Sequence, residues 1–306
     1  MAFTAKDVQT LRERTGCGMM DCKKALTEAD GNMDKAAELL REKGLAAAAK
    51  KSGRVAAEGV VMAVVNEAKK TGAIIEVNSE TDFVGKNADF IKFVEACANT
   101  VIDENPADED ALANCKLSGS NETVAEALRE KILTIGENMK IRRFVRYEGD
   151  IVSYVHGGGR IGVMVKFDTD VAGKPEFIEY AKDIAMQIAA INPAYLRKED
   201  VPADVLAKEK EILMVQIQND EKLKNKPEQV IVKMVEGKIG KYYKENCLIE
   251  QPFVKDGNMT VAKYTEETAK ALNGKISIVS FVRFEKGEGL EKREDNFADE
   301  VASMIK

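Results

Sequence analysis

Side chains suited to catalysis or metal binding are few in this sequence. A single histidine, His156, excludes paired-histidine metal sites and the HExxH pattern of metalloproteases. Cys17 and Cys22 have no second cysteine pair at ligand spacing, so we expect half-buried helix residues rather than zinc ligands. The Gly-Lys pairs in FVGKN, AGKPE and NGKIS lack the upstream glycine and the following hydroxyl residue of a phosphate-binding loop. The sequence therefore predicts no enzyme active site, no metal and no cofactor.

The glycine-rich segment after His156 allows two interpretations. HGGGR, residues 156–160, could form an oxyanion loop, but no GxSxG nucleophile motif accompanies it. We prefer a tight turn between two strands.

One large apolar side chain, Phe83, lies where a loop should be polar. Its segment SETDFVGKNADF, residues 79–90, separates the β-branched run AIIEVN from the helix-like stretch ADFIKFVEACA. The phenylalanine could anchor its own loop in the core, or it could stay exposed and contact a partner.

An internal repeat decides between these two roles. The copies begin at Glu58 and Glu148, and each has Glu-Gly, two β-rich stretches, Thr-Asp, Gly-Lys and a Phe-Ile that opens a helix. Two ββα units indicate a duplicated α+β core with antiparallel sheets. TDFVGKNADFI is one residue longer than TDVAGKPEFI, and the simplest alignment makes Phe83 the inserted residue. A phenylalanine required by the fold should recur in the second copy, so we expect Phe83 to be exposed and directed at a partner.

The elements before the repeat are helical. Thr4 and Asp7 resemble a capping box, and apolar stripes at helical spacing predict three short helices, the last ending at Gly44. Residues 45–54, LAAAAKKSGR, are expected to form a linker, helical in part. A three-helix module with so small a core suits docking on another protein better than catalysis.

Two long helices are predicted after the second copy. PADVLAKEKEILMVQIQND and PEQVIVKMVEGKIGKYYKEN each begin with proline and are joined by a short polar link. This pattern predicts an antiparallel helical hairpin over residues 202–246, with Ile212 and Val235 in its seam. The hairpin could pack on its own body or contact another chain.

The remaining segments alternate between helix and strand. NETVAEALREKILTIGEN and TVAKYTEETAKAL predict capped helices, MKIRRFVRYEG predicts a strand, and DNFADEVASMI predicts a last helix. KISIVSFVRFE predicts a strand whose inward face holds four apolar side chains, Ile276, Ile278, Val282 and Phe284.

Composition excludes several classes of function. The net charge of −6 argues against direct nucleic-acid binding, which needs a surplus of Lys and Arg. No apolar run approaches the eighteen residues of a membrane span, and the charged start does not resemble a signal peptide. An odd number of cysteines, five, suggests reduced thiols. We therefore expect a soluble cytoplasmic protein without nucleic-acid or membrane partners.

Several motifs in order carry a resemblance to a known family. They are LRERTGCGMMDCKKALTEADGN near the start, TDFVGKN in the core, HGGGRIGV, QPFV and FVRFEKGEG. Together they span nearly the whole chain. The sequence resembles the elongation factor Ts family, the bacterial guanine-nucleotide exchange factors for elongation factor Tu.

The resemblance implies a modular fold. It consists of an N-terminal helical domain similar to ubiquitin-associated (UBA) domains, a core of two repeated subdomains, an inserted helical hairpin and a C-terminal helical module. The corresponding segments are 1–54 for the N-terminal domain with its linker, 55–145 for the first subdomain, 146–200 with 247–286 for the second, 201–246 for the hairpin and 287–306 for the C-terminal module.

The resemblance also implies a mechanism and a set of contact residues. The loop Thr81–Val84 would approach the nucleotide site of Tu, where Asp82 and Phe83 disturb magnesium and phosphate binding so that GDP leaves. His156 and Gly157 would contact Tu as well. The N-terminal domain would add further contacts, for which we select Arg12, Met19 and Met20. Gly85 replaces an alanine that is frequent in the family and should loosen the loop slightly.

Two other functions remain open at this level. A protein–protein adaptor with a UBA-like module but no exchange activity is the nearer alternative. A small-molecule enzyme on the duplicated core would need a convergent polar constellation that the sequence does not contain. The helical hairpin could also pair with a second copy and form a homodimer.

Overall fold

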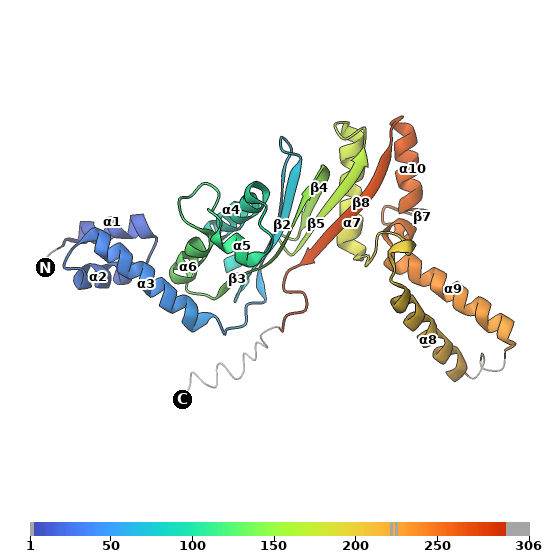
Figure 1. The fold of residues 1–306 in the computed structure, drawn as a ribbon, viewed down its shortest axis with the longest axis horizontal. Helices are drawn as coiled ribbons and strands as arrows, with labels where there is room; N and C mark the ends of the chain where they lie inside the picture. The colour runs from blue at the N-terminus through green and yellow to red at the C-terminus, as the bar shows by residue number, and fades with distance from the viewer. Residues whose placement is uncertain (1–2, 221–222, 224–225, 292–306) are drawn as a thin grey trace.

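The computed structural model describes residues 3–220, 223 and 226–291. Ten α-helices and antiparallel sheets in this part of the chain confirm the α+β class. Figure 1 shows an elongated molecule, with three helices at one end, two sheets in the middle and a pair of helices at the other end. The helix predicted over 295–305 lies outside the described residues.

The N-terminal module consists of helices α1 (Ala5–Thr15), α2 (Met19–Glu28) and α3 (Met33–Lys51). The Thr4–Asp7 capping box begins α1 as predicted. The expectation that the third helix ends at Gly44 is wrong, because α3 continues to Lys51 and includes most of the predicted linker. Gly44 lies against Leu133 of a later helix, where a Cβ would be in ordinary van der Waals contact, 3.6 Å from the Leu133 side chain.

The first sheet has the order β1–β2–β3 and is antiparallel throughout. Its strands are Glu58–Asn66, Thr71–Ser79 and Met139–Glu148. The helices of this half are α4 (Ala88–Glu104), α5 (Glu109–Asn114) and α6 (Val124–Ile135). Side chains of β2, α4 and α6 share one buried core. Val84, in the loop between β2 and α4, belongs to the same core and anchors the loop on it.

The second sheet repeats this plan with the order β4–β5–β8. Its strands are Asp150–His156, Ile161–Thr169 and Ile276–Glu285. The helices α7 (Pro175–Ile191) and α10 (Val261–Ala271) cover one face and bury an aromatic cluster. The other face packs on the first sheet through Val61, Ile74, Met164 and Phe284.

The internal repeat is longer than the sequence comparison found. Each copy continues after its ββα unit with a helix whose N-cap threonine, Thr123 or Thr260, accepts a hydrogen bond from the backbone three residues later. Each of these helices leads to the third strand of its sheet, β3 or β8. TVAEAL against TVAKYT and RFVRYE against SFVRFE were the available sequence signals.

A β-bulge overturns the predicted inward face of β8. Ser280 pairs with Lys166 but Ile278 pairs with Phe167, so one extra residue, Val279, lies between them. An extra residue shifts all later side chains to the opposite face of the strand. Ile276 and Ile278 therefore contact the α7 core, whereas Val282 and Phe284 contact the first sheet.

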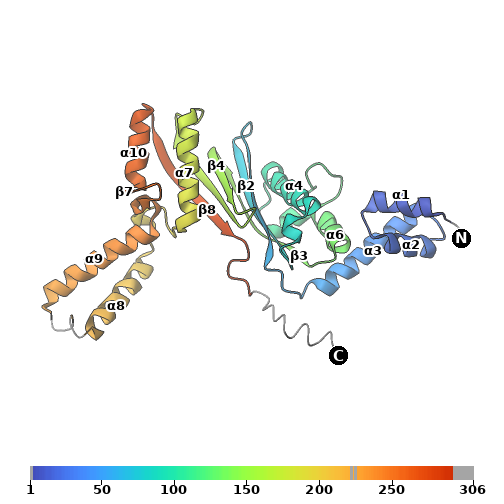
Figure 2. The ribbon, with the colours of Figure 1, turned by 180° about the vertical axis from the view of Figure 1, so that it is seen from behind.

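The pair of helices at the far end is α8 (Ala203–Asn219) and α9 (Glu228–Asn246), seen from behind in Figure 2. Leu213 and Ile217 of α8 pack against Val235 and Ile239 of α9. Ile212 is 43% exposed, so its predicted place in the seam is wrong. Short elements connect the pair to the second sheet: η2 (Lys198–Asp200), η3 (Leu248–Glu250), β6 (Pro252–Phe253) and β7 (Asp256–Thr260).

Candidate partner-binding surface

The loop between β2 and α4 presents Phe83 to solvent. Phe83 is 76% exposed, the largest value among the exposed large hydrophobic residues of the described part of the chain. The 3-10 turn η1 (Val84–Lys86) follows, and the Lys86 ammonium lies 5.8 Å from the centre of the Phe83 ring. Lys86 also donates to Asp82 at 2.6 Å, and this hydrogen bond lowers the pKa of Asp82. The aromatic ring is thus flanked by an exposed ion pair.

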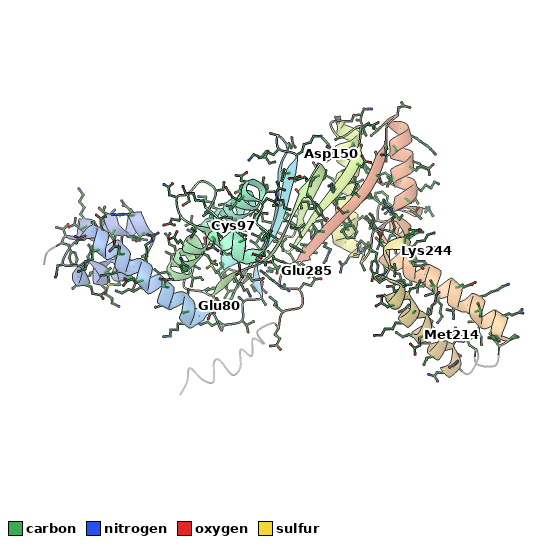
Figure 3. The ribbon with its side chains drawn as sticks, in the orientation of Figure 1. Glu80, Cys97, Asp150, Met214, Lys244 and Glu285 are labelled. Atoms are coloured by element: carbon green, nitrogen blue, oxygen red, sulfur yellow. The ribbon has the colours of Figure 1, made fainter. Side chains whose placement is uncertain are left out.

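The base of this loop is held on both sides of Phe83. Thr81 donates to the Glu137 carboxylate through its backbone N–H at 2.9 Å and its hydroxyl at 2.6 Å. Val84 is buried in the core of the first half. Glu80, labelled in Figure 3, pairs with Arg54 just beyond α3. A loop held at both ends has less backbone freedom to lose on contact with a partner, which reduces the entropy cost of binding.

The close contact of Gly85 contradicts the expectation of a looser loop. A Cβ on Gly85 would lie 2.6 Å from the Gly59 carbonyl oxygen of β1. The glycine therefore lets the loop approach the β1 backbone more closely than an alanine could without a shift of the backbone. In this chain Gly85 tightens the packing of the loop on the sheet.

Strand register identifies which residues of the two copies correspond. β2 and β5 each contain nine residues. The bulge of the first sheet lies after Glu76, and that of the second lies after Lys166. These two residues are therefore equivalent, and Ser79 corresponds to Thr169.

The insertion in the first copy is consequently three residues long. Residues 80–87, eight in number, connect β2 to α4, whereas residues 170–174, five in number, connect β5 to α7. Val84 and Val171 are the buried anchors of the two connections. The residues without a counterpart are thus Thr81–Phe83, and the expected one-residue insertion of Phe83 alone is wrong. The Thr-Asp pairs that suggested it occupy different positions in the two copies.

The segment after His156 is the predicted turn between two strands. Gly157, Gly158 and Gly159 have φ angles of +60°, +63° and +94°, which side chains other than glycine rarely adopt. His156 is exposed, and its Nδ1 lies 2.9 Å from the Tyr154 hydroxyl. The turn thus presents an imidazole supported by a neighbouring aromatic residue of the same strand face.

The start of β1 brings the Phe83 loop and the His156 turn onto one support. Gly59 contacts Gly85 of the loop. The next residues contact the turn, since a Cβ on Gly159 would meet Val60 and the Val61 N–H donates to the Gly159 carbonyl at 2.8 Å. The structure therefore joins Thr81–Val84 and His156–Gly157 through a strand that the sequence did not single out. The only sequence signal was the presence of glycine at positions 59 and 85, the two residues whose backbones are in close contact.

The N-terminal candidates lie elsewhere. Met19 and Met20 are 45% and 62% exposed at the start of α2, and Arg12 is exposed on α1. Figure 1 places α1 and α2 at the end of the molecule, separated from the sheets by α3 and α6. Arg41 of α3 pairs with Glu122 and Glu126 where the module contacts α6. The structure does not bring these candidates together with the Phe83 loop.

The cysteines of the N-terminal module are buried apolar residues. Cys17 lies in the turn before α2 rather than in a helix, and Cys22 lies in α2. Burial raises the pKa of both thiols. Within the described residues, no group of three or more His, Cys, Asp or Glu could hold a metal ion. No helix in the same part of the chain is long and apolar enough to span a bilayer.

The fold and this surface define a modular α+β protein with an exposed phenylalanine on a braced loop. The family model described as Elongation factor TS matches residues 80–288. Elongation factor Ts of Clostridium botulinum (strain Eklund 17B / Type B) is 54% identical over 306 residues, 99% of each chain. The proteins of the same name from Clostridium perfringens (strain 13 / Type A) and Clostridium kluyveri (strain NBRC 12016) are 54% and 51% identical over 305 and 308 residues, again 99% of each chain.

The chain belongs to the elongation factor Ts family. It is therefore a translation elongation factor that acts in protein biosynthesis.

Proposed function

We propose that this protein is a guanine-nucleotide exchange factor that binds elongation factor Tu in its GDP form and promotes release of GDP. The Thr81–Phe83 insertion is the contact that drives exchange, and Phe83 is the side chain inserted near the nucleotide and magnesium site. Family membership supports this proposal. The single observation that supports it most is the 76% exposure of Phe83 on a loop held by Glu137 and by its own Val84.

The energetics set the size of the effect. Burial of a phenylalanine in a partner is worth about 1.5–3 kcal/mol. At about 1.4 kcal/mol per tenfold change, Phe83 alone shifts nucleotide affinity by roughly one to two decades. Because coupling between two ligands is reciprocal, GDP in turn weakens binding of the factor. A larger effect needs additional contacts, for which His156 and Gly157 on the neighbouring turn are the nearest candidates.

The decisive experiment is stopped-flow release of a fluorescent GDP from elongation factor Tu, with the parent chain and with Phe83→Ala. The parent is expected to accelerate release and the variant to lose most of that acceleration while retaining much of its affinity. Val279→Ala, which shortens another exposed apolar side chain in the second copy, is the matched control and should behave as the parent. Equal acceleration by the parent and Phe83→Ala would remove Phe83 from the mechanism.

A second contact is proposed for the N-terminal module. Met19 and Met20 form an exposed apolar pair at the start of α2, with Arg12 on the adjacent helix. Because they lie far from the loop, the double variant Met19→Ala, Met20→Ala should weaken binding of Tu and leave the maximal release rate unchanged. A lower maximal rate at saturation would contradict this division of roles.

The alternative is an adaptor that binds a GTPase without exchange. Co-sedimentation with elongation factor Tu but no acceleration of GDP release by a folded parent would support it. Pairing of two copies through the helical hairpin stays a separate prediction, suggested by the exposed Ile212 and Val215 on α8. Sedimentation velocity of the chain alone tests it, since a monomer at micromolar concentration would exclude this dimer.

A further inference from the structure

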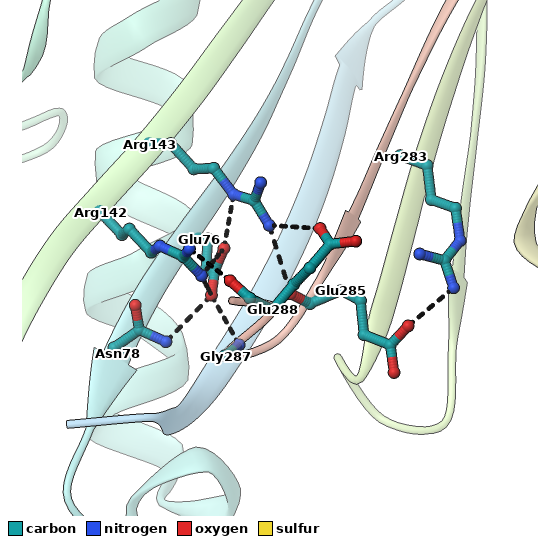
Figure 4. Close-up of polar contacts among 8 residues, drawn as sticks. All are labelled: Glu76, Asn78, Arg142, Arg143, Arg283, Glu285, Gly287 and Glu288. Atoms are coloured by element: carbon teal, nitrogen blue, oxygen red, sulfur yellow. Dashed lines mark hydrogen bonds and ion pairs between the residues drawn. The ribbon is translucent and has the colours of Figure 1, made fainter. Parts of the chain in front are cut away.

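A fully buried carboxylate lies between the two sheets. Glu76 of β2 is 0% exposed and lies two residues after Ile74, on the side of the first sheet that faces the second. Figure 4 shows the groups that converge on it. Asn78 Nδ2 donates at 3.0 Å, Arg142 Nη1 at 3.1 Å, Arg143 Nε at 2.7 Å and the backbone N–H of Gly287 at 2.8 Å. The last of these donors belongs to the chain after β8, more than two hundred residues away in sequence.

The β-bulge of the first sheet explains why two consecutive arginines reach the same carboxylate. Glu76 pairs with Arg143 and Val77 pairs with Ile141, so Arg142 is the extra residue. A bulge turns two successive side chains toward similar directions, whereas a regular strand would send them to opposite faces. Arg143 also stacks on the Phe284 ring of β8, 4.2 Å from its centre. The cluster thus connects both sheets.

The residues after β8, Lys286–Glu288, form a strap across this region. The Lys286 N–H donates to the Arg160 carbonyl at 2.9 Å, in the turn after His156, and its ammonium pairs with Glu58 at the start of β1. Gly287 has a φ of +70° and lies so close to the chain before β1 that a Cβ would be 2.2 Å from the Ala57 carbonyl oxygen. One side of the strap therefore contacts the turn, and the other contacts the strand that supports the Phe83 loop.

Glu288 completes the attachment of the strap to the first sheet. Its carboxylate pairs with Arg143 at 3.1 Å, and its backbone carbonyl accepts a hydrogen bond from Arg142. The arginines thus bridge the buried Glu76 and the strap. Ion networks of this kind are poor sources of net stability, because desolvation offsets most of the attraction. Their geometric specificity is the better explanation for a buried carboxylate here.

We propose that Glu76 is a positioning residue for the partner surface: it anchors the Lys286–Glu288 strap, and the strap sets the His156 turn relative to the Phe83 loop. This inference rests on the proposed exchange function. Glu76 itself is buried and does not contact the partner. Its role is to keep two contact regions from different halves of the core at one spacing, so that both engage the same partner at once.

Two variants test the proposal through different chemistry. Glu76→Gln removes the charge that attracts Arg142, Arg143 and Gly287. Gly287→Ala leaves every charge in place and displaces the strap by a steric clash with Ala57. Lys166→Gln, at the equivalent position of the second sheet, is the matched control.

The first readout separates positioning from binding. In the GDP-release assay with elongation factor Tu, both test variants should lower the maximal rate about tenfold or more, because a small misplacement of the two contact regions relative to each other is costly. The control should retain the parent rate. An unchanged maximal rate in folded Glu76→Gln and Gly287→Ala would overturn the proposal.

The second readout does not depend on exchange activity. Amide hydrogen exchange of the Val61 N–H reports the docking of the turn on β1, because that group donates to the Gly159 carbonyl. Both test variants should accelerate exchange at Lys286, at position 287 and at Val61 by a larger factor than at the core amides of α4 and α7. A uniform increase across the chain would identify Glu76 as a general stabiliser and overturn its positioning role.

These readouts also distinguish the failure of the two proposals. A parent chain that does not accelerate GDP release refutes the exchange function, whatever the variants do. Amide exchange then still decides whether Glu76 couples the strap to the turn. An unperturbed Val61 amide in both variants would refute that coupling even if the parent is a fully active exchange factor.

Discussion

The two copies of the core share a frame down to individual hydrogen bonds. Arg146 of β3 donates to the Ile102 carbonyl in the last turn of α4, and Arg283 of β8 donates to the Ala189 carbonyl in the last turn of α7. A cation at these positions satisfies free carbonyls and complements the negative end of each helix. The equivalent arginines show that duplication preserved the contacts that join the third strand to the helix.

The connections after β2 and β5 begin with an equivalent contact as well. Glu80 accepts a hydrogen bond from the Asn138 N–H, and Asp170 accepts one from the Lys275 N–H, just before the third strand of each sheet. Beyond this point the first copy adds Thr81–Phe83 and the second does not. The copies also differ at Glu76, which has Lys166 as its counterpart. The proposed function thus depends on residues at which the two copies differ, whereas the residues that they share maintain the fold.

The largest difference in stability between equivalent substitutions in the two copies is expected at Glu76. Glu76→Ala leaves Arg142 and Arg143 without their shared carboxylate, and breaking a buried ion pair costs about 3 kcal/mol or more of the free energy of unfolding. Lys166→Ala should change that free energy by less than about 0.5 kcal/mol, as is usual away from a buried network. Urea denaturation of both variants measures the difference. Equal losses at the two positions would mean that the copies are energetically alike here.

Deletion of Thr81–Phe83 should make the first connection equal in length to the second. The acceleration of GDP release from elongation factor Tu is expected to fall about a hundredfold, because about 2.7 kcal/mol of partner contact is lost. Far-ultraviolet circular dichroism should be unchanged, since Val84 still anchors the connection. In the converse control, the same three residues are inserted after Asp170 of the deletion variant. A gain of activity there would show that the insertion works in either copy.

The buried carboxylate of the first copy, which has no counterpart in the second, should make the stability of the protein depend on pH. Burial by itself raises the pKa of Glu76, but the hydrogen bonds from Gly287, Asn78 and Arg143 outweigh it and hold the pKa below its usual range. A depressed carboxyl pKa stabilises the fold above the unfolded pKa of about 4.3, and this contribution is lost as the pH falls through the lower folded pKa. Thermal melts of the parent and Glu76→Gln should therefore differ by a constant amount from pH 7 to about pH 5 and converge in stronger acid. A difference that grows as the pH falls would show that folding raises the pKa of Glu76 instead of lowering it.

The smallest effect is expected for the ion pair beside Phe83. Lys86 and Asp82 are both exposed, and water and salt screen such pairs so that they contribute little to stability. Lys86→Ala should leave the free energy of unfolding unchanged and should alter GDP release less than Phe83→Ala does. A larger effect on release than that of Phe83→Ala would assign the main contact to the charge rather than to the ring.

Local patterns predicted much of the frame. Caps such as Thr4, apolar periodicity and glycine-rich turns depend on neighbours within a few residues, so the helices, the antiparallel hairpins and the turn after His156 followed from them. The exposure of Phe83 followed from the internal repeat. The β8 face and the extent of α3 could not be predicted in this way, because a bulge and a helix contact at Gly44 depend on distant partners.

The class of fold, the duplication and the exposed phenylalanine follow from the amino-acid sequence alone, since local periodicity or a comparison of the chain with itself reveals each of them. Which residues are inserted depends on the folded sheets, because register is defined by a partner strand and not by matching letters such as Thr-Asp. The support that Gly59 and Val60 give to the loop and the turn also arises only in the folded chain. The same holds for Glu76 and Gly287, which meet because two sheets and a strap converge, a contact with no local signature.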